Sequence, residues 1–350
     1  MIKLGIIFGG RSGEHTVSLM SAASVISAFD DKKFQKVCIG ITRQGEWRRF
    51  DGVTSDIESG AWEEKSTPFA INDLKKEIDF VFPILHGPYG EDGTIQGLFE
   101  MLDIPYAGCG VLASSLAMDK IMAKKVFESC GIPICKYTTV MAEELDVDNE
   151  KLAVRVESEL DGEYPLFVKP ANMGSSVGIT KVKNRATLIE ALYEAAKHDR
   201  RLVVEKGVDG REIEAAMLGN TDAKASIIGE IIPSEEFYDY HAKYFDGGKT
   251  ELIIPAEIDD KIAEETRQIA IKAYKALDCT GFARVDFFLE RQTNKIYMNE
   301  INTIPGFTKF SMFPLLWQHT GITYPELLER IVELGYERYH AKNNRQATIA

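Results

Sequence analysis

The first third of the chain alternates short apolar runs with helical patterns, and this alternation constrains the fold more than any other feature. Apolar runs at 4–8, 37–42 and 80–85 each have the length of a strand. A helical pattern covers 17–29, and after Gly93 apolar residues recur at i, i+3, i+4 and i+7. Because strands connected through helices run parallel, the pattern predicts a parallel sheet with helices on both faces.

The rest of the chain mixes strands and helices less regularly. One helix is predicted over 114–129, since Gly131 and Pro133 follow it as stop signals. The other predicted strands are 165–170, 201–206, 212–218, 225–232, 251–254, 282–290 and 295–302, and the other predicted helices are 186–198, 259–277 and 325–336. We expect the polar tail 341–350 to be frayed.

Length and composition limit the class of protein. The 350 residues suit two or three domains, and 45% hydrophobic and 27% charged residues are ordinary for a soluble globular chain. We predict an α/β protein, with a parallel α/β domain over 1–110 and two α+β domains over 111–207 and 208–350. A net charge of −13 argues against nucleic acid as a general partner.

The cysteines and the apolar runs indicate where in the cell the protein is found. Five scattered cysteines without metal-binding spacing indicate reduced thiols. No apolar run approaches the ~18 residues of a membrane-spanning helix, and the N-terminus lacks a signal-peptide pattern. We therefore expect a cytoplasmic protein without a membrane partner.

The last two predicted strands place polar groups on one face. If they form a hairpin centred on Thr293, Asp286 lies directly opposite Glu300. The same register puts Arg284 opposite Asn302 on that face, which Phe288 and Met298 would share and make partly apolar. Facing carboxylates repel each other unless a cation lies between them, and carboxylate and amide oxygens suit Mg²⁺. The alternative is a solvated polar face.

Three shorter signals each allow two interpretations. Lys169 ends an apolar strand before a loop of small residues, which suits phosphate binding or a lysine that extends into solvent. The Pro305–Gly306 turn lets a backbone N–H approach a ligand, or it is an ordinary turn. Glu14 begins a helix, where it holds an ammonium group or complements the helix dipole.

Two further segments suggest a covered cleft. Residues 237–244 are rich in tyrosine and charge, which is typical of a flap over an active site. Glu205 and Lys206 end one predicted strand and Glu212 begins the next, so both acids can line a nucleotide pocket at a domain junction.

Taken in order, these motifs resemble the ATP-grasp superfamily and, within it, the D-alanine–D-alanine ligases. The resemblance spans residues 3–338 and implies a three-domain ATP-grasp architecture in which the two α+β domains sandwich ATP. It rests on Gly9-Gly10-x-Ser12-x-Glu14-x-x-Val17-Ser18, Leu85-His86-Gly87-x-x-Gly90-Glu91-Asp92-Gly93, Met118-Asp119-Lys120, Val168-Lys169-Pro170 with Gly174-Ser175-Ser176, Phe237 to Tyr244, Arg284-x-Asp286, and Asn299-Glu300-x-Asn302-Thr303-x-Pro305-Gly306.

The resemblance implies roles for residues at the nucleotide and the metal. The residues that match the ATP site are Lys120, Lys169, Ser176, Glu205, Lys206, Val208 and Glu212. Asp286, Glu300 and Asn302 match the ligands of two Mg²⁺ ions, with Mn²⁺ as an alternative metal. A monovalent cation is a further candidate cofactor.

Other matches concern the two D-alanine molecules. Glu14 matches the acid that holds the first ammonium group, and together with Ser175 and Tyr244 it matches a hydrogen-bonded trio that closes the flap. Arg284 and the Gly306 N–H match the groups that stabilise the acyl phosphate and the tetrahedral intermediate. The residues that match the substrate-binding set are His86, Tyr238, Lys243, Ser311 and Met312, with Ser311 at the second carboxylate.

The implied activity is ATP-dependent formation of D-alanyl-D-alanine for peptidoglycan precursors, by a homodimer. D-Serine and D-lactate ligases of the same family are the alternative. Met312 favours D-alanine, since the D-serine group tends to carry arginine there, and Lys243-Tyr244 is absent from the D-lactate group. Another carboxylate–amine ligase, a non-catalytic nucleotide sensor and a dinucleotide oxidoreductase remain competing interpretations, although the glycine spacing of residues 9–13 departs from a dinucleotide-binding fingerprint.

Overall fold

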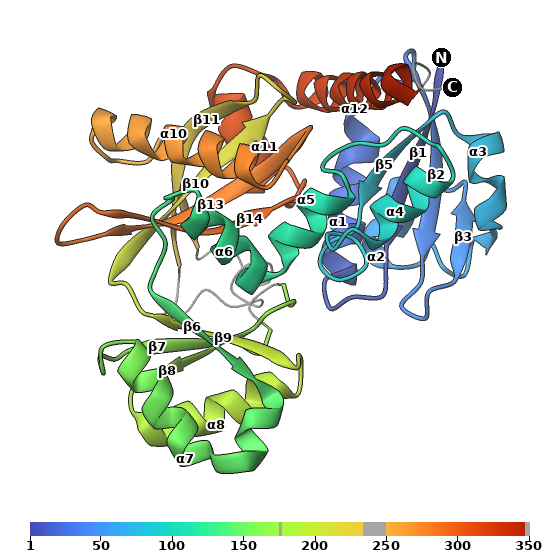
Figure 1. Cartoon of the computed structure of the whole chain (residues 1–350). Coiled ribbons are helices and arrows are strands. Elements are labelled where there is room, and N and C mark those ends of the chain that lie inside the picture. The colour runs from blue at the N-terminus through green and yellow to red at the C-terminus, as the bar shows by residue number, and fades with distance from the viewer. Residues whose placement is uncertain (175–176, 234–249, 347–350) are drawn as a thin grey trace.

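The computed structural model describes residues 1–174, 177–233 and 250–346. These residues form three sheets, each with its own helices (Figure 1). The four-stranded sheet with α7 and α8 stands apart at the bottom of Figure 1, and the two five-stranded sheets lie side by side above it. Among the described residues, no helix combines the length and apolarity needed to cross a membrane.

The N-terminal sheet has the order β4-β3-β2-β1-β5. As predicted, β1, β2 and β5 are parallel, while β3 and β4 add an antiparallel edge. Its elements are β1 (Ile2–Gly9), α1 (His15–Ala28), β2 (Phe34–Ile41), β3 (Trp47–Phe50), α2 (Thr54–Ser59), β4 (Thr67–Pro68), a 3-10 turn (Ile71–Asp73), α3 (Leu74–Glu77), β5 (Phe80–Ile84) and α4 (Thr94–Met101). Alternate residues of β1 enter different cores: Ile6 packs with α1, and Ile7 packs with α4.

The second sheet is antiparallel, in the order β6-β9-β7-β8. Its elements are β6 (Tyr137–Met141), α7 (Ala142–Glu159), β7 (Leu166–Pro170), β8 (Thr180–Val182), α8 (Arg185–Ala196) and β9 (Arg201–Lys206). Helix α7 was not predicted: its residues are strongly charged, and Asp148 interrupts it with a non-helical φ of −163°.

The third sheet has the order β12-β11-β10-β13-β14 and is antiparallel. Its elements are β10 (Gly210–Leu218), β11 (Lys224–Ile232), β12 (Glu251–Ile253), α10 (Asp260–Ala276), β13 (Phe282–Glu290), β14 (Ile296–Asn302), α11 (Met312–His319) and α12 (Tyr324–Gln346). Helix α10 covers one face, where Ala270 and Tyr274 are buried against Ile213 and Val285.

Two predicted helices differ from those observed. The segment 114–129 belongs to two helices, α5 (Val111–Met118) and α6 (Lys120–Ser129), because Asp119 is extended and its carboxylate caps α6 by accepting the N–H groups of Ile121 and Met122. Helix α12 continues to Gln346, so the prediction of fraying was wrong for the first part of the tail. The domain boundaries near 110 and 207 stay predictions.

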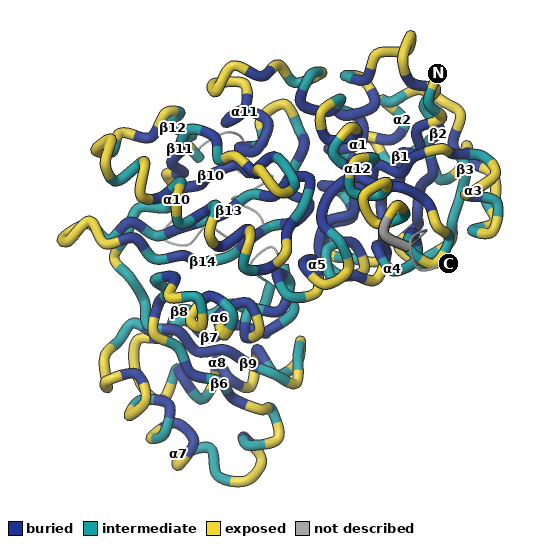
Figure 2. Tube along the Cα trace, turned by 45° about the horizontal axis from the view of Figure 1, so that its top comes forward, coloured by how far each residue is buried: buried dark blue, intermediate teal, exposed yellow. Residues whose placement is uncertain are grey.

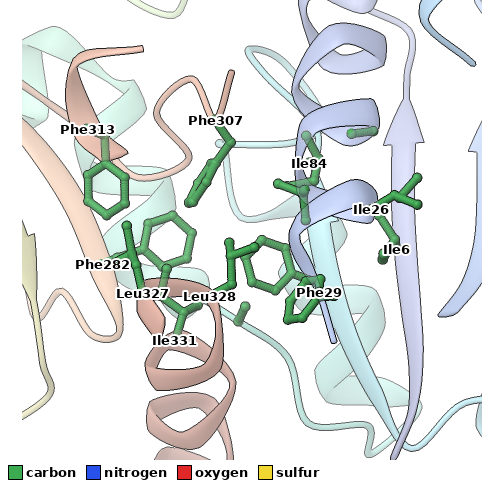
Figure 3. Close-up of a cluster of buried hydrophobic side chains, with 14 of the residues drawn as sticks. Ile6, Ile26, Phe29, Ile84, Phe282, Phe307, Phe313, Leu327, Leu328 and Ile331 are labelled. Atoms are coloured by element: carbon green, nitrogen blue, oxygen red, sulfur yellow. The ribbon is translucent and has the colours of Figure 1, made fainter. Parts of the chain in front are cut away.

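An aromatic core joins the N-terminal sheet to the third sheet (Figure 3). Phe307 lies 5.8 Å from Phe82 and 5.3 Å from Phe282 between ring centroids, both in edge-on geometry. Leu327 and Ile331 of α12 complete this core. Strands β1 and β10, one from each of the two sheets, are mostly buried and are drawn mostly in dark blue in Figure 2. The packing of Phe307 therefore fixes the position of the adjacent Gly306.

Candidate active site

A cavity of about 1310 Å³ lies where the three sheets meet. All the described candidate residues except Asp286 line it: Glu14, His86, Lys120, Lys169, Glu205, Lys206, Val208, Glu212, Arg284, Glu300, Asn302, Gly306, Ser311 and Met312. The candidates Ser175, Ser176, Tyr238, Lys243 and Tyr244 lie outside the described residues.

The hairpin of β13 and β14 has the predicted register at its functional end. Asp286 pairs with Glu300, and Arg284 pairs with Asn302. Beyond Asp286 the register shifts by one residue, so that Phe287 pairs with Met298. The expectation that Met298 shares the polar face was wrong, because this bulge turns its side chain into the core, where it is fully buried.

Arg284 is held between two carboxylates on the cavity wall. Its Nε and Nη2 donate to the two oxygens of Asp286 at 2.7 Å each, and Glu214 lies 2.9 Å from Nε. The Asn302 amide also donates to Asp286, at 2.9 Å. Paired carboxylates restrict the guanidinium to one orientation, so its position is set before a ligand binds.

The donor set near Glu300 suits a hard divalent cation. Asp286 and Glu300 face each other across the two strands, and Asn302 is hydrogen-bonded to Asp286. Within the described ranges, no three acidic, histidine or cysteine side chains converge at one point. Two carboxylates and one amide are a donor set that fits Mg²⁺, because this ion keeps waters and takes substrate phosphates.

The carboxylate of Glu14 is enclosed by two glycines, Gly87 in the loop after β5 and Gly174 in the loop after β7. A Cβ atom on Gly87 would lie 2.2 Å from Glu14 Oε2, and one on Gly174 would lie 2.7 Å from the same atom. Any side chain at Gly87 or Gly174 would therefore displace this acid. Glu14 reaches the loop after β7, which supports the predicted meeting of the N-terminal and central segments.

His86 links three segments at the floor of the cavity. Its Nδ1 lies 2.8 Å from the Ile304 carbonyl oxygen, which can only accept, so Nδ1 carries the proton. Its Nε2 therefore accepts from the hydroxyl of Ser21, at 3.1 Å, and Ser21 Oγ in turn accepts the Phe307 N–H at 3.3 Å. Burial lowers the pKa of His86, which keeps this neutral tautomer.

A second buried acid, Glu91, holds the same loop. Its carboxylate oxygens accept the N–H of Gly87 at 2.8 Å and that of Ile304 at 2.9 Å. Burial, and after it the negative charge of Glu14, raises the pKa of Glu91 to about 8, although the two N–H groups act in the opposite direction.

The segment after β14 lines one end of the cavity. Ser311 Oγ accepts the Thr308 N–H at 3.1 Å, and a Cβ atom at Gly306 would lie 2.8 Å from that oxygen. Met312 is buried at the start of α11, where its Sδ would be 2.7 Å from a Cβ atom at Gly229. The absence of a side chain at Gly229 makes room for Met312.

Basic groups line the opposite end of the cavity. Lys120 Nζ donates to the Met173 carbonyl oxygen at 2.6 Å, and Lys169 Nζ lies 2.9 Å from Glu205. Lys206 forms an ion pair with Glu163. Lys120 begins a helix and Lys169 lies near the end of a strand, so two rigid elements position the two ammonium groups.

Sequence reasoning overlooked several residues that line this cavity or contact the residues that line it. Glu214 follows Glu212 by two positions on β10, so strand alternation places both on one face. Glu91 lies inside a motif that carried the resemblance, and Lys124 follows Lys120 by one helical turn. Ser21 had only a weak signal, as a small polar residue within an apolar helix.

Comparisons with known proteins agree with this geometry. Residues 3–109 match the family described as D-ala D-ala ligase N-terminus, and residues 126–333 match D-ala D-ala ligase C-terminus. The D-alanine–D-alanine ligase of Thermoanaerobacter sp. (strain X514) is 50% identical over 97% of this chain and 98% of its own length. That of Bacillus cytotoxicus is 46% identical over 99% of both chains.

Two solved structures are also similar. The D-alanine–D-alanine ligase from Coxiella burnetii superposes with a TM-score of 0.87 at 33% identity, over 99% of this chain and 97% of that one. The VanG D-Ala:D-Ser ligase from Enterococcus faecalis has a TM-score of 0.85 at 37% identity, over 95% and 99%.

The fold and the matched families define a ligase of the ATP-grasp type, as the sequence analysis expected. More narrowly, the chain belongs to the D-alanine–D-alanine ligase family.

Proposed function

We propose that this enzyme joins two D-alanine molecules to D-alanyl-D-alanine through an acyl phosphate, with ATP converted to ADP and phosphate, for peptidoglycan precursors. The observation that carries the proposal is the set of side chains that line one cavity. Glu14 lines the same cavity as Lys120 and Lys169, and Arg284, held by its carboxylate partners, lines it too. An ammonium group, a triphosphate and a developing anion thus each have an oppositely charged partner.

The first step transfers the γ-phosphoryl group to the carboxylate of the first D-alanine. Glu14 binds its ammonium group, while Lys120 and Lys169 bind phosphate oxygens and offset their charge. Asp286, Glu300 and Asn302 would hold two Mg²⁺ ions, or Mn²⁺, which neutralise phosphate charge when bound. At the other end of the nucleotide, Glu205, Lys206, Val208 and Glu212 would contact the adenine and ribose.

In the second step, the amine of the second D-alanine attacks the acyl phosphate carbonyl and phosphate leaves. The Gly306 N–H and Arg284 stabilise the oxyanion. Arg284 is held by its two carboxylate partners, and Gly306 is held by the packed Phe307. Ser311 would bind the second carboxylate. From the resemblance alone, Ser175, Ser176, Tyr238, Lys243 and Tyr244 would complete and close the site, and the enzyme would be a homodimer.

One comparison favours a test of the acceptor, because the VanG D-Ala:D-Ser ligase is a similar structure. Buried, apolar Met312 beside Ser311 offers no partner for an extra hydroxyl group, which favours D-alanine over D-serine.

The test measures phosphate release from ATP and Mg²⁺ with D-alanine, D-serine or D-lactate as the acceptor, with products identified by mass. We expect D-alanine-dependent release with an equal yield of D-alanyl-D-alanine. A preference for D-serine or D-lactate at neutral pH would overturn the acceptor, and no release with any of them would overturn the ligase proposal.

A further inference from the structure

A buried ion-pair triad lies behind the part of the cavity that Lys120 and Lys169 line. Glu205 at the end of β9 has an ammonium group on each oxygen: Lys124 Nζ lies 3.0 Å from Oε1, and Lys169 Nζ lies 2.9 Å from Oε2. The side chains of Lys124 and Glu205 are only 2% and 4% exposed. Lysines are almost never buried to this degree without a specific partner.

The two lysines differ in what they face. Lys169 and Glu205 line the cavity, whereas Lys124 lies behind them on α6, with its ammonium group 5.7 Å from the centroid of the Tyr137 ring. Lys124 therefore meets Glu205 from the protein side and is not among the cavity-lining residues. It follows Lys120 by four residues, so one face of α6 carries both.

The charges of this triad explain why a second lysine is needed. A pair of Glu205 and Lys169 alone would be neutral, and the carboxylate would compete with phosphate for the Lys169 ammonium group. With Lys124 included, two positive charges and one negative charge leave a net charge of +1. Burial by itself raises the pKa of Glu205, but Lys124 and Lys169 lower it to about 2, so the carboxylate stays ionised.

We propose that Lys124 is a positioning residue that neutralises Glu205 and thereby leaves the charge of Lys169 available to the nucleotide phosphates. This inference rests on the proposed ATP site and deepens it. It predicts that the loss of Lys124 weakens the binding of phosphates more than the binding of the nucleoside.

The experiment measures ADP and adenosine binding by calorimetry in wild type, Lys124→Met and the control Lys125→Met. Lys125 is the exposed neighbour on the same helix. We expect Lys124→Met to bind ADP about tenfold more weakly, the worth of one charge-assisted hydrogen bond, with adenosine affinity within about twofold of wild type. Lys125→Met should match wild type for both ligands.

A double-mutant cycle separates this role from a structural one. In a Glu205→Gln background the charge that Lys124 neutralises is gone, so adding Lys124→Met should change ADP affinity by less than about twofold. A purely structural lysine would cost about the same in both backgrounds. This comparison remains available if Lys124→Met alone does not fold, because the double variant contains no uncompensated carboxylate.

Three results would overturn the inference alone: unchanged ADP affinity in Lys124→Met, an equal loss for adenosine, or a full loss in the Glu205→Gln background. Failure of the wild-type protein to bind ADP would overturn the proposed function as well, so the two failures are distinguishable.

Discussion

Ser21 on α1 is the residue whose removal tests how the catalytic loop is held. Its hydroxyl is fully buried, donates to His86 and accepts the Phe307 N–H. Ser21→Ala leaves both of these buried groups without a partner while removing only one atom. Because Phe307 follows Gly306, the substitution loosens the loop that carries the proposed oxyanion donor.

The magnitude follows from the two contacts. At 3.1 and 3.3 Å they are long, so each lost partner costs about 1 kcal/mol. Alanine is the better helix former by about 0.5 kcal/mol, which leaves a net loss of about 1.5 kcal/mol. For 350 residues the entropy of unfolding is about 0.7 kcal/mol/K, so this loss corresponds to a fall in the melting temperature of about 2 °C. We also expect kcat for dipeptide formation to fall about tenfold, because small displacements of a catalytic group are costly.

The assay combines thermal unfolding with steady-state kinetics, and Ser24→Ala is the matched control. Ser24 lies on the same helix, but its hydroxyl donates only to the Met20 carbonyl oxygen within that helix, at 3.1 Å. We expect the control to keep the melting temperature and kcat of wild type, and both variants to keep the KM for ATP. If Ser21→Ala behaves like Ser24→Ala in both measurements, the proposed anchoring of the loop is wrong.

Three further predictions concern the metal, the start of α6 and pH. Glu300→Gln should reduce ATP turnover at least about 100-fold without lowering the melting temperature, because it removes metal-binding charge; unchanged turnover at saturating Mg²⁺ would contradict the assignment. Asp119→Ala removes the N-cap of α6 just before Lys120, so it should lower the free energy of unfolding by about 1–2 kcal/mol and raise the KM for ATP. The control Asn184→Ala, which removes the N-cap of α8, should lower stability without changing that KM. His86 is buried with a lowered pKa, so the unfolded chain binds a proton that the folded one does not, and stability should fall as pH drops below about 6.5. The free energy of unfolding, measured against pH for wild type and His86→Gln, should fall less steeply below about pH 6.5 in the variant. Equal slopes in the two proteins would contradict the assignment of a neutral His86.

Periodicity along the chain was enough to predict much of the architecture. Side-chain alternation placed Asp286 opposite Glu300, and the strand–helix alternation of the first 110 residues predicted a parallel sheet, which β2, β1 and β5 form. These predictions succeeded because the period of a strand or helix and the demand for an apolar face are local properties of the sequence.

Local patterns failed where a single residue interrupted an element. The bulge after Asp286 moved Met298 to the core, and Asp119 divided a continuous helical pattern into α5 and α6. Both interruptions have contacts with segments that are distant in the sequence. Asp119 also pairs with Arg201 of β9, and the Met298 N–H donates to the Pro133 carbonyl oxygen at 2.8 Å. Periodicity contains no information about such partners.

The chain's own residue order thus determined which side chains were available for chemistry, through short motifs on strands, turns and helix starts. Only the tertiary structure decided which of them meet. Lys124 reaches Glu205 across 81 positions, and His86 reaches Ile304 across 218. Such contacts depend on how three sheets pack around one cavity, and the energy of that packing comes from buried surfaces that no local sequence window contains.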